Sequence, residues 1–204
     1  MLTVILYAGV AIAVKPYANI ISAGINLFTL DKKPDYDQSK SVYTDSVDND
    51  KQVILSSTIK YPKEGEQYGE VIYSKLELDQ PLYFGDTPAI LAKGAAQYMG
   101  SVFPGMGGTT LIGGHKLPYF GKLYFAEVGD TFEINTNYAT YTYQVKEKSI
   151  KQFDDPMIDA ALKDMETNQV ILYTCYPMNS VGATKQRVFV VAEQIHGPKI
   201  DLTK

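Results

Sequence analysis

Residues 170–191 read VILYTCYPMNSVGATKQRVFVV and contain two strand-like runs, VILYT at 170–174 and RVFVV at 187–191. β-Branched and aromatic residues fill both runs, whereas Pro, Asn and Gly stand between them, a pattern typical of two strands joined by a loop. Cys175, the only cysteine of the chain, follows the first run, and Arg187, the only arginine, begins the second. If the two strands are neighbours, they bring a thiol and a guanidinium together.

The alternation of side chains along a strand decides which residues can meet. Successive side chains point to opposite faces, so Ile171, Tyr173 and Cys175 share one face of their strand, and Arg187 shares a face with Phe189. The register between the two strands stays open at this stage. Lysine and arginine together number 19, and only one of them is arginine. We therefore expect Arg187 at a place that needs a planar, permanently charged fork.

Two histidines are available as partners of the thiol. His115 ends the apolar stretch TTLIGGH at 109–115, whose two glycines are expected to let the backbone turn tightly and to leave the imidazole uncrowded. His196 precedes Gly-Pro in a polar tail, which is typical of a surface loop. We therefore predict Cys175, His115 and Arg187 as the catalytic residues.

Each of these residues also has an ordinary structural interpretation. A lone cysteine after a strand is often a small buried hydrophobe, a histidine after two glycines is often a loop residue, and an arginine at a strand start is often a solvated charge. All three stand at the ends of strand-like segments, and a cysteine nucleophile with a sequence-distant histidine is a known pattern. This combination favours catalysis.

These residues resemble the bacterial sortases, cysteine transpeptidases that anchor proteins to cell walls. LYTC at 172–175 is similar to the family signature Thr-Leu-x-Thr-Cys with Ile171 in place of the first Thr, and the stretch 109–115 is similar to the family's strand that ends in Gly-His. Arg187 is similar to the family's arginine. The resemblance runs from about Glu70 to Glu193, and the sequence around Cys175 to Met178 is most similar to class D.

The resemblance implies an all-β fold, a closed sortase-type β-barrel of about eight strands with one or two short helices. It implies that Cys175 forms a thioacyl intermediate with a sorting-signal threonine, that His115 exchanges protons with the leaving and incoming amines, and that Arg187 holds the oxyanion or the substrate backbone. The implied partners are LPxT-like sorting-signal peptides of surface proteins and a cell-wall precursor amine. No cofactor or metal is expected, since Glu64, Glu66, Glu70 and Asp79 lack EF-hand spacing.

The residue pattern independently indicates a small barrel or sandwich, because strands of even spacing dominate the chain. Early strands are expected at 71–73 and 75–82, and residues 131–135 and 139–147 flank Asn-rich turn chemistry that predicts a hairpin. One helix is expected from Pro156 to Met165, with Asp155 as its N-cap. Its predicted apolar face consists of Ile158, Ala161, Leu162 and Met165.

Length and charge indicate one enzyme domain with an appendage. The chain has 204 residues and a net charge of -4, with no basic stripe, so a nucleic-acid partner is not expected. Residues 1–30 are apolar with Lys15 as the only charge, which predicts a membrane anchor or signal segment. Residues 31–55 are expected to form a polar linker and 56–204 the sortase catalytic domain. We therefore expect the protein at the cell membrane, with an extracellular catalytic domain anchored through the N-terminus.

Two other classes of protein remain open. A secreted cysteine peptidase would use the same cysteine and histidine but would transfer the acyl group to water. A non-enzymatic surface binding barrel would keep the three residues for structural reasons. Within the sortases, a pilus-polymerising enzyme would carry an Asp-Pro-aromatic lid, whereas residues 33–36 here read KPDY.

Overall fold

The structure is a computed structural model that describes residues 53–117, 120–180 and 184–203. The predicted membrane segment 1–30 and residues 31–52 of the predicted linker lie outside the described residues. The last three residues assigned to the linker form strand β1 (Val53–Leu55), which pairs in parallel with β10 (Lys199–Asp201). In the described ranges, no helix has the length and apolar character that a membrane crossing needs.

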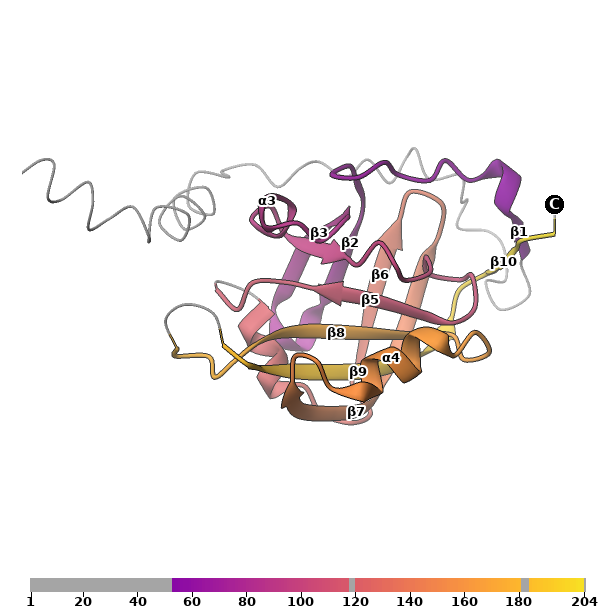
Figure 1. Ribbon diagram of the computed structural model, residues 1–204. Helices are drawn as coiled ribbons and strands as arrows, with labels where there is room; N and C mark the ends of the chain where they lie inside the picture. The colour runs from indigo at the N-terminus through magenta and orange to yellow at the C-terminus, as the bar shows by residue number, and fades with distance from the viewer. Residues whose placement is uncertain (1–52, 118–119, 181–183, 204) are drawn as a thin grey trace, which may run out of the picture. The chain divides into compact units, whose positions relative to one another are not determined.

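Eight strands close into a β-barrel in the order β2-β3-β4-β5-β8-β9-β7-β6 (Figure 1), which confirms the predicted fold. The β3–β4 and β5–β8 pairs are parallel, and the other neighbouring pairs are antiparallel. The barrel strands are β2 (Gln67–Tyr73), β3 (Leu78–Phe84), β4 (Ala95–Gln97), β5 (Thr109–Gly113), β6 (Thr131–Thr136), β7 (Thr140–Gln152), β8 (Gln169–Tyr176) and β9 (Gln186–His196).

The local predictions are mostly confirmed, with shifted boundaries. β6 and β7 form the predicted antiparallel hairpin. The second early strand begins at Leu78 instead of Lys75, because the 3-10 turn η5 (Ser74–Leu76) and Glu77 intervene. Glu77 has a left-handed backbone with φ of 48°, which ends the turn and redirects the chain into β3. The remaining short elements are η4 (Ser56–Thr58), α3 (Pro88–Leu91) and η6 (Phe120–Phe125).

Helix α4 (Pro156–Lys163) confirms the predicted helix and its cap. The Asp155 carboxylate accepts a hydrogen bond of 3.0 Å from the Met157 amide, which satisfies one of the free donors of the first turn. The helix ends two residues before the predicted Met165, since the Asp164 carboxylate instead accepts the amides of the following turn. Met165 is therefore exposed and does not belong to the packed face, which is a correction to the prediction.

The barrel core is rich in tyrosine. Tyr68, Tyr73, Tyr141 and Tyr143 are fully buried inside the barrel. Buried tyrosines usually find partners for their hydroxyl groups. The Tyr73 hydroxyl donates to the Asp130 carboxylate at 2.7 Å and the Tyr68 hydroxyl donates to Gln97, whereas the Tyr141 hydroxyl has no partner among the described residues. Large rings with a polar tip thus fill a barrel that contains no tryptophan.

Candidate active site

Cys175 and Arg187 are direct cross-strand partners in the antiparallel pair β8–β9. The Cβ atoms of such partners lie about 4.5–5.5 Å apart, and their side chains project from the same face of the sheet. The register that the sequence left open therefore places the thiol beside the root of the guanidinium-bearing side chain. Both residues are half-buried.

The face that carries both residues is the outside of the barrel. Val170, Leu172 and Val188 alternate with the site residues and belong to the interior core. On the outer face, Ile171 and Phe189 form a second, smaller cluster with Leu111, and this cluster is covered by α4. In Figure 1, α4 lies in front of β8 and β9. On this outer face, α4 covers Ile171 and Phe189, whereas Cys175 and Arg187 lie nearer the strand ends, outside that cluster.

His115 follows strand β5, which is the other neighbour of β8. The parallel register pairs Gly113 with Tyr173, and it continues beyond the strand because the Gly114 amide donates to the Tyr173 carbonyl at 3.1 Å and the Thr174 hydroxyl donates to the Gly114 carbonyl at 2.8 Å. Extended by one more residue, this register sets His115 beside Cys175. The structure therefore brings all three predicted residues to the same end of three adjacent strands, with the cysteine in the middle.

Gly113 and Gly114, the two glycines before His115, do not form the predicted tight turn. Neither has a positive φ. A Cβ on Gly113 would lie 2.6 Å from the Tyr173 ring, and one on Gly114 would lie 2.4 Å from the Phe120 ring. Glycine is needed because aromatic rings lie directly against the backbone of this segment. The rings hold the segment that carries His115 in place.

Tyr173 occupies the outer face two residues before the cysteine. Its ring contacts Phe189 at a centroid distance of 6.0 Å. Burial raises the pKa of Tyr173, and the Asp86 carboxylate adds to this effect whereas Arg187 opposes it. The hydroxyl therefore stays neutral at physiological pH, and Tyr173 forms an aromatic surface next to the thiol.

The imidazole of His115 is exposed and has no hydrogen-bond or ion-pair partner within the described ranges. Partial desolvation lowers the pKa of His115, because removing water disfavours the charged form. At neutral pH the ring is therefore mostly neutral. Its neighbour Lys116 donates hydrogen bonds to the carbonyl and, at 2.6 Å, the hydroxyl of Ser180, which ties the histidine segment to the loop after the cysteine.

Arg187 is held by its own loop and by an aromatic ring. Its Nη1 donates to the Thr184 carbonyl at 2.6 Å and to the Gln186 carbonyl at 2.9 Å. The guanidinium carbon lies 5.9 Å from the centre of the Phe153 ring. Nε and Nη2 make no hydrogen bond within the described ranges, so part of the donor fork is available for a ligand.

His196 does not join this site. The structure places it at the last position of β9, on a strand instead of the predicted loop, although it is exposed as expected. Arg187 stands at the opposite end of the same strand, which corresponds to roughly 30 Å at the rise of an extended chain. Of the two histidines, only His115 lies at the end of the barrel that carries the cysteine.

Residue types alone could not reveal the further contacts of the site. Thr184 accepts a hydrogen bond from Arg187, and the Phe153 ring lies near the guanidinium. Neither residue was predicted from the sequence, because Phe153 is far from Arg187 in the sequence and Thr184 has no distinctive context. The contact of Lys116 with Ser180 was also not predicted, because only the neighbouring His115 was considered in the sequence. A signal for Phe153 would have required the β7–β9 register, which pairs residues more than thirty positions apart.

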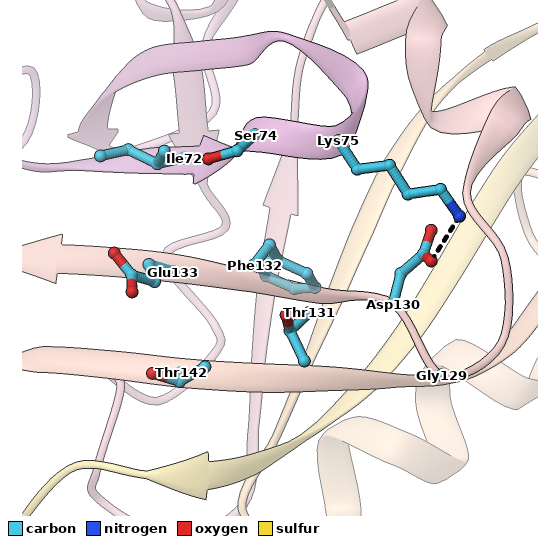
Figure 2. Close-up of a pocket in the computed structure, with 9 residues that line it drawn as sticks. All are labelled: Ile72, Ser74, Lys75, Gly129, Asp130, Thr131, Phe132, Glu133 and Thr142. Atoms are coloured by element: carbon cyan, nitrogen blue, oxygen red, sulfur yellow. Dashed lines mark hydrogen bonds and ion pairs between the residues drawn. The ribbon is translucent and has the colours of Figure 1, made fainter.

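A separate pocket of about 460 Å³ lies along β2, β6 and β7 (Figure 2). Figure 2 shows the Lys75 side chain pointing toward Asp130. The Lys75 ammonium lies 2.7 Å from the Asp130 carboxylate and 2.5 Å from the Glu127 carboxylate. The cation is thus already paired with carboxylates, and none of the predicted catalytic residues lines this pocket. Across the described part of the chain, no three His, Cys, Asp or Glu side chains gather in a metal-binding group.

The closed barrel sets Cys175 on a strand between the strand that leads to His115 and the strand that begins near Arg187. Comparison with known proteins assigns this chain to a family. Residues 73–195 match the family model of the Sortase domain. The chain belongs to the sortase family. In general terms it is therefore a sortase-type transpeptidase.

Individual relatives agree with this assignment. Sortase D of Bacillus subtilis (strain 168) is 27% identical over 134 residues, which cover 66% of this chain and 67% of the relative. A sortase C structure from Streptococcus pneumoniae is 27% identical with a TM-score of 0.58, over 65% of this chain and 70% of that one. A Clostridium perfringens sortase C, solved with the C-terminal cell wall sorting motif, shares the fold with a TM-score of 0.58 at 24% identity, over 65% and 72% of the two chains.

Proposed function

We propose that this protein is a membrane-anchored, extracellular sortase that cleaves an LPxT-like sorting signal and transfers the acyl part to a cell-wall amine. The observation that carries the proposal is the direct pairing of Cys175 with Arg187, beside the end of the strand that leads to His115. Family membership supports the reaction class, and the geometry supports the roles that we propose for the three residues.

In the first half-reaction, the Cys175 thiolate attacks the carbonyl carbon of the signal threonine. The tetrahedral oxyanion collapses, a thioester forms and the peptide C–N bond breaks. Protonated His115 gives its proton to the leaving amine. Because the pKa of His115 is lowered, the imidazolium that this step needs is a minority form of the histidine at neutral pH.

In the second half-reaction, a primary amine attacks the thioester carbon. Neutral His115 accepts the proton that the amine loses, a new amide bond forms and the thiolate leaves. The lowered pKa favours this neutral, proton-accepting form. The exposed position of the imidazole leaves room for an incoming amine.

Arg187 serves the oxyanion in both half-reactions. Its Nη1 is bound to the loop carbonyls, so the guanidinium is oriented before the substrate arrives, while Nε and Nη2 remain available as donors. Donors that are preorganised toward a developing negative charge stabilise the transition state strongly. The pairing of Arg187 with Cys175 supports this role, because the side chains of cross-strand partners project from the same face of the sheet.

Three features support the substrate class and the location. The Clostridium perfringens sortase C was solved with a cell wall sorting motif, and this chain shares its fold. The sortase D relative agrees with the class D resemblance of the segment after Cys175. The apolar residues 1–30 support anchoring at the cell membrane with the catalytic domain outside.

Incubation with an LPxT-like peptide, with and without an added primary amine, tests the reaction. We expect a thioacyl adduct on Cys175 by intact-protein mass spectrometry, and a ligated product that replaces the hydrolysed one as the amine concentration rises. A secreted peptidase would yield the same hydrolysed product in both conditions. Failure of a thiol-directed vinyl sulfone to label Cys175, together with absent cleavage, would favour the binding barrel.

Substitution Arg187→Lys is expected to lower kcat/KM by about 10²–10³, the usual loss on removal of one oxyanion donor. Lysine retains the positive charge but replaces the planar fork by a flexible point charge. Steady-state kinetics on a cleavable sorting peptide measure the effect.

Lys185→Gln provides a matched control, because it removes an exposed positive charge two residues away. We expect its kcat/KM to stay within about twofold of the wild type, as for a screened surface charge. If Arg187→Lys were as active as the wild type, a general positive charge would suffice and the assigned role of the fork would be wrong.

A further inference from the structure

The aromatic residue beside Arg187 is the least expected part of the site. Phe153 directly follows β7 and is 58% exposed, although it is a large apolar side chain. Its ring centre lies 5.9 Å from the guanidinium carbon of Arg187, at the outer limit for attraction between a cation and an aromatic face. The exposed Phe153 ring is therefore close enough to attract the Arg187 guanidinium.

Backbone hydrogen bonds fix the position of Phe153 relative to the loop that binds Arg187. The Phe153 amide donates to the Lys185 carbonyl at 2.8 Å, which continues the β7–β9 ladder by one residue. Lys185 lies between the two residues whose carbonyls bind Nη1, Thr184 and Gln186. The backbone of Phe153 is therefore hydrogen-bonded directly to the 184–186 segment, whose carbonyls bind Nη1 of Arg187.

The charges around Arg187 explain why such a contact is useful. Lys151 on β7 is the cross-strand partner of Arg187 on the side opposite Cys175, and like charges on adjacent strands repel. The Lys151 ammonium forms an ion pair with the Glu147 carboxylate instead, at 3.9 Å. Within the described ranges, Arg187 has no carboxylate that would anchor it. Loop carbonyls at one edge and an aromatic face are the contacts that orient the guanidinium.

We propose that Phe153 is a positioning residue for Arg187: its ring and the Thr184 carbonyl together hold the guanidinium so that Nε and Nη2 remain directed to the substrate. This inference rests on the proposed function of Arg187 at the oxyanion. Phe153 itself takes no part in proton transfer or bond making.

The kinetic test compares Phe153→Ala with Phe125→Ala, since Phe125 is also 58% exposed and packs on Tyr124 instead of on a cation. A cation–aromatic contact at an exposed site biases an equilibrium by about two- to fivefold. We expect Phe153→Ala to lower kcat on a sorting peptide by that factor with KM unchanged, Phe153→Tyr to retain activity, and Phe125→Ala to have no effect.

A double-mutant cycle separates positioning from substrate contact. In an Arg187→Lys background, Phe153→Ala is expected to cause no further loss, because the planar group that it holds is absent. An equal loss in both backgrounds, or a rise in KM alone, would overturn the proposal and indicate that the ring contacts the substrate. Unchanged kcat in Phe153→Ala would also overturn it.

An activity-independent measurement uses the fact that Arg187 is the only arginine of the chain. Its Nε–Hε NMR signal is therefore unambiguous. We expect an upfield shift from the Phe153 ring that is lost in Phe153→Leu and retained in Phe125→Leu. Equal spectra for the wild type and Phe153→Leu would refute the contact. Absence of peptide cleavage by the wild type, with this shift present, would instead refute the proposed function.

Discussion

Cys175→Ala is expected to abolish peptide cleavage and transpeptidation while the barrel stays folded. The substitution removes the chain's only thiol, and loss of the nucleophile of a comparable covalent mechanism costs on the order of 10⁶ in kcat. Little volume is lost, since Cys175 is half-buried at a strand end and lies outside the interior core. Cleavage of an LPxT-like peptide, followed by chromatography, measures the effect.

Circular dichroism and thermal unfolding of the same variant are the controls. We expect a wild-type spectrum and a Tm close to that of the wild type, because the β8–β9 ladder needs only the backbone at this position. The vinyl sulfone should label the wild type and leave Cys175→Ala unlabelled. Residual transpeptidation in a folded Cys175→Ala protein, above a background without enzyme, would show that another group is the nucleophile.

His115→Asn is expected to lower kcat/KM by about 10²–10⁴, the range for loss of a general acid–base residue. Asparagine retains polarity and similar size but cannot exchange a proton near neutral pH. The loss should appear in both half-reactions, because the imidazole gives a proton to the leaving amine and accepts one from the incoming amine. Single-turnover formation of the thioacyl adduct and its reaction with an amine measure the two steps separately.

His196→Asn is the matched control, since it makes the same substitution at the far end of β9. We expect its kcat/KM to be near that of the wild type at a temperature well below Tm. Equal losses in the two variants would mean that the wrong histidine was assigned, or that neither exchanges protons. A loss confined to acylation in His115→Asn would restrict the histidine to the role of general acid.

Local sequence signals predicted the elements well. The Asp155-Pro156 pair predicted the start of α4, and the Asn-rich turn predicted the β6–β7 hairpin, because caps and turns depend on a few adjacent residues. Helix length was less predictable. Met165 fits the apolar spacing, but the chain turns at Asp164, whose carboxylate binds the next amides.

Through its resemblance to the sortases, the sequence by itself predicted the family, the barrel of about eight strands and the residue types of the candidate site, since one cysteine, one arginine and one Gly-Gly-His segment leave little choice. Only the tertiary structure decided that Cys175 pairs with Arg187, because a slip of one residue would turn one of them to the other face. It also decided that the candidate site lies on the outer face of the barrel, and that the Phe153 ring centre lies 5.9 Å from the guanidinium carbon of Arg187. Alternation along a strand is local, whereas register arises from the packing of all eight strands and cannot be read from any one of them.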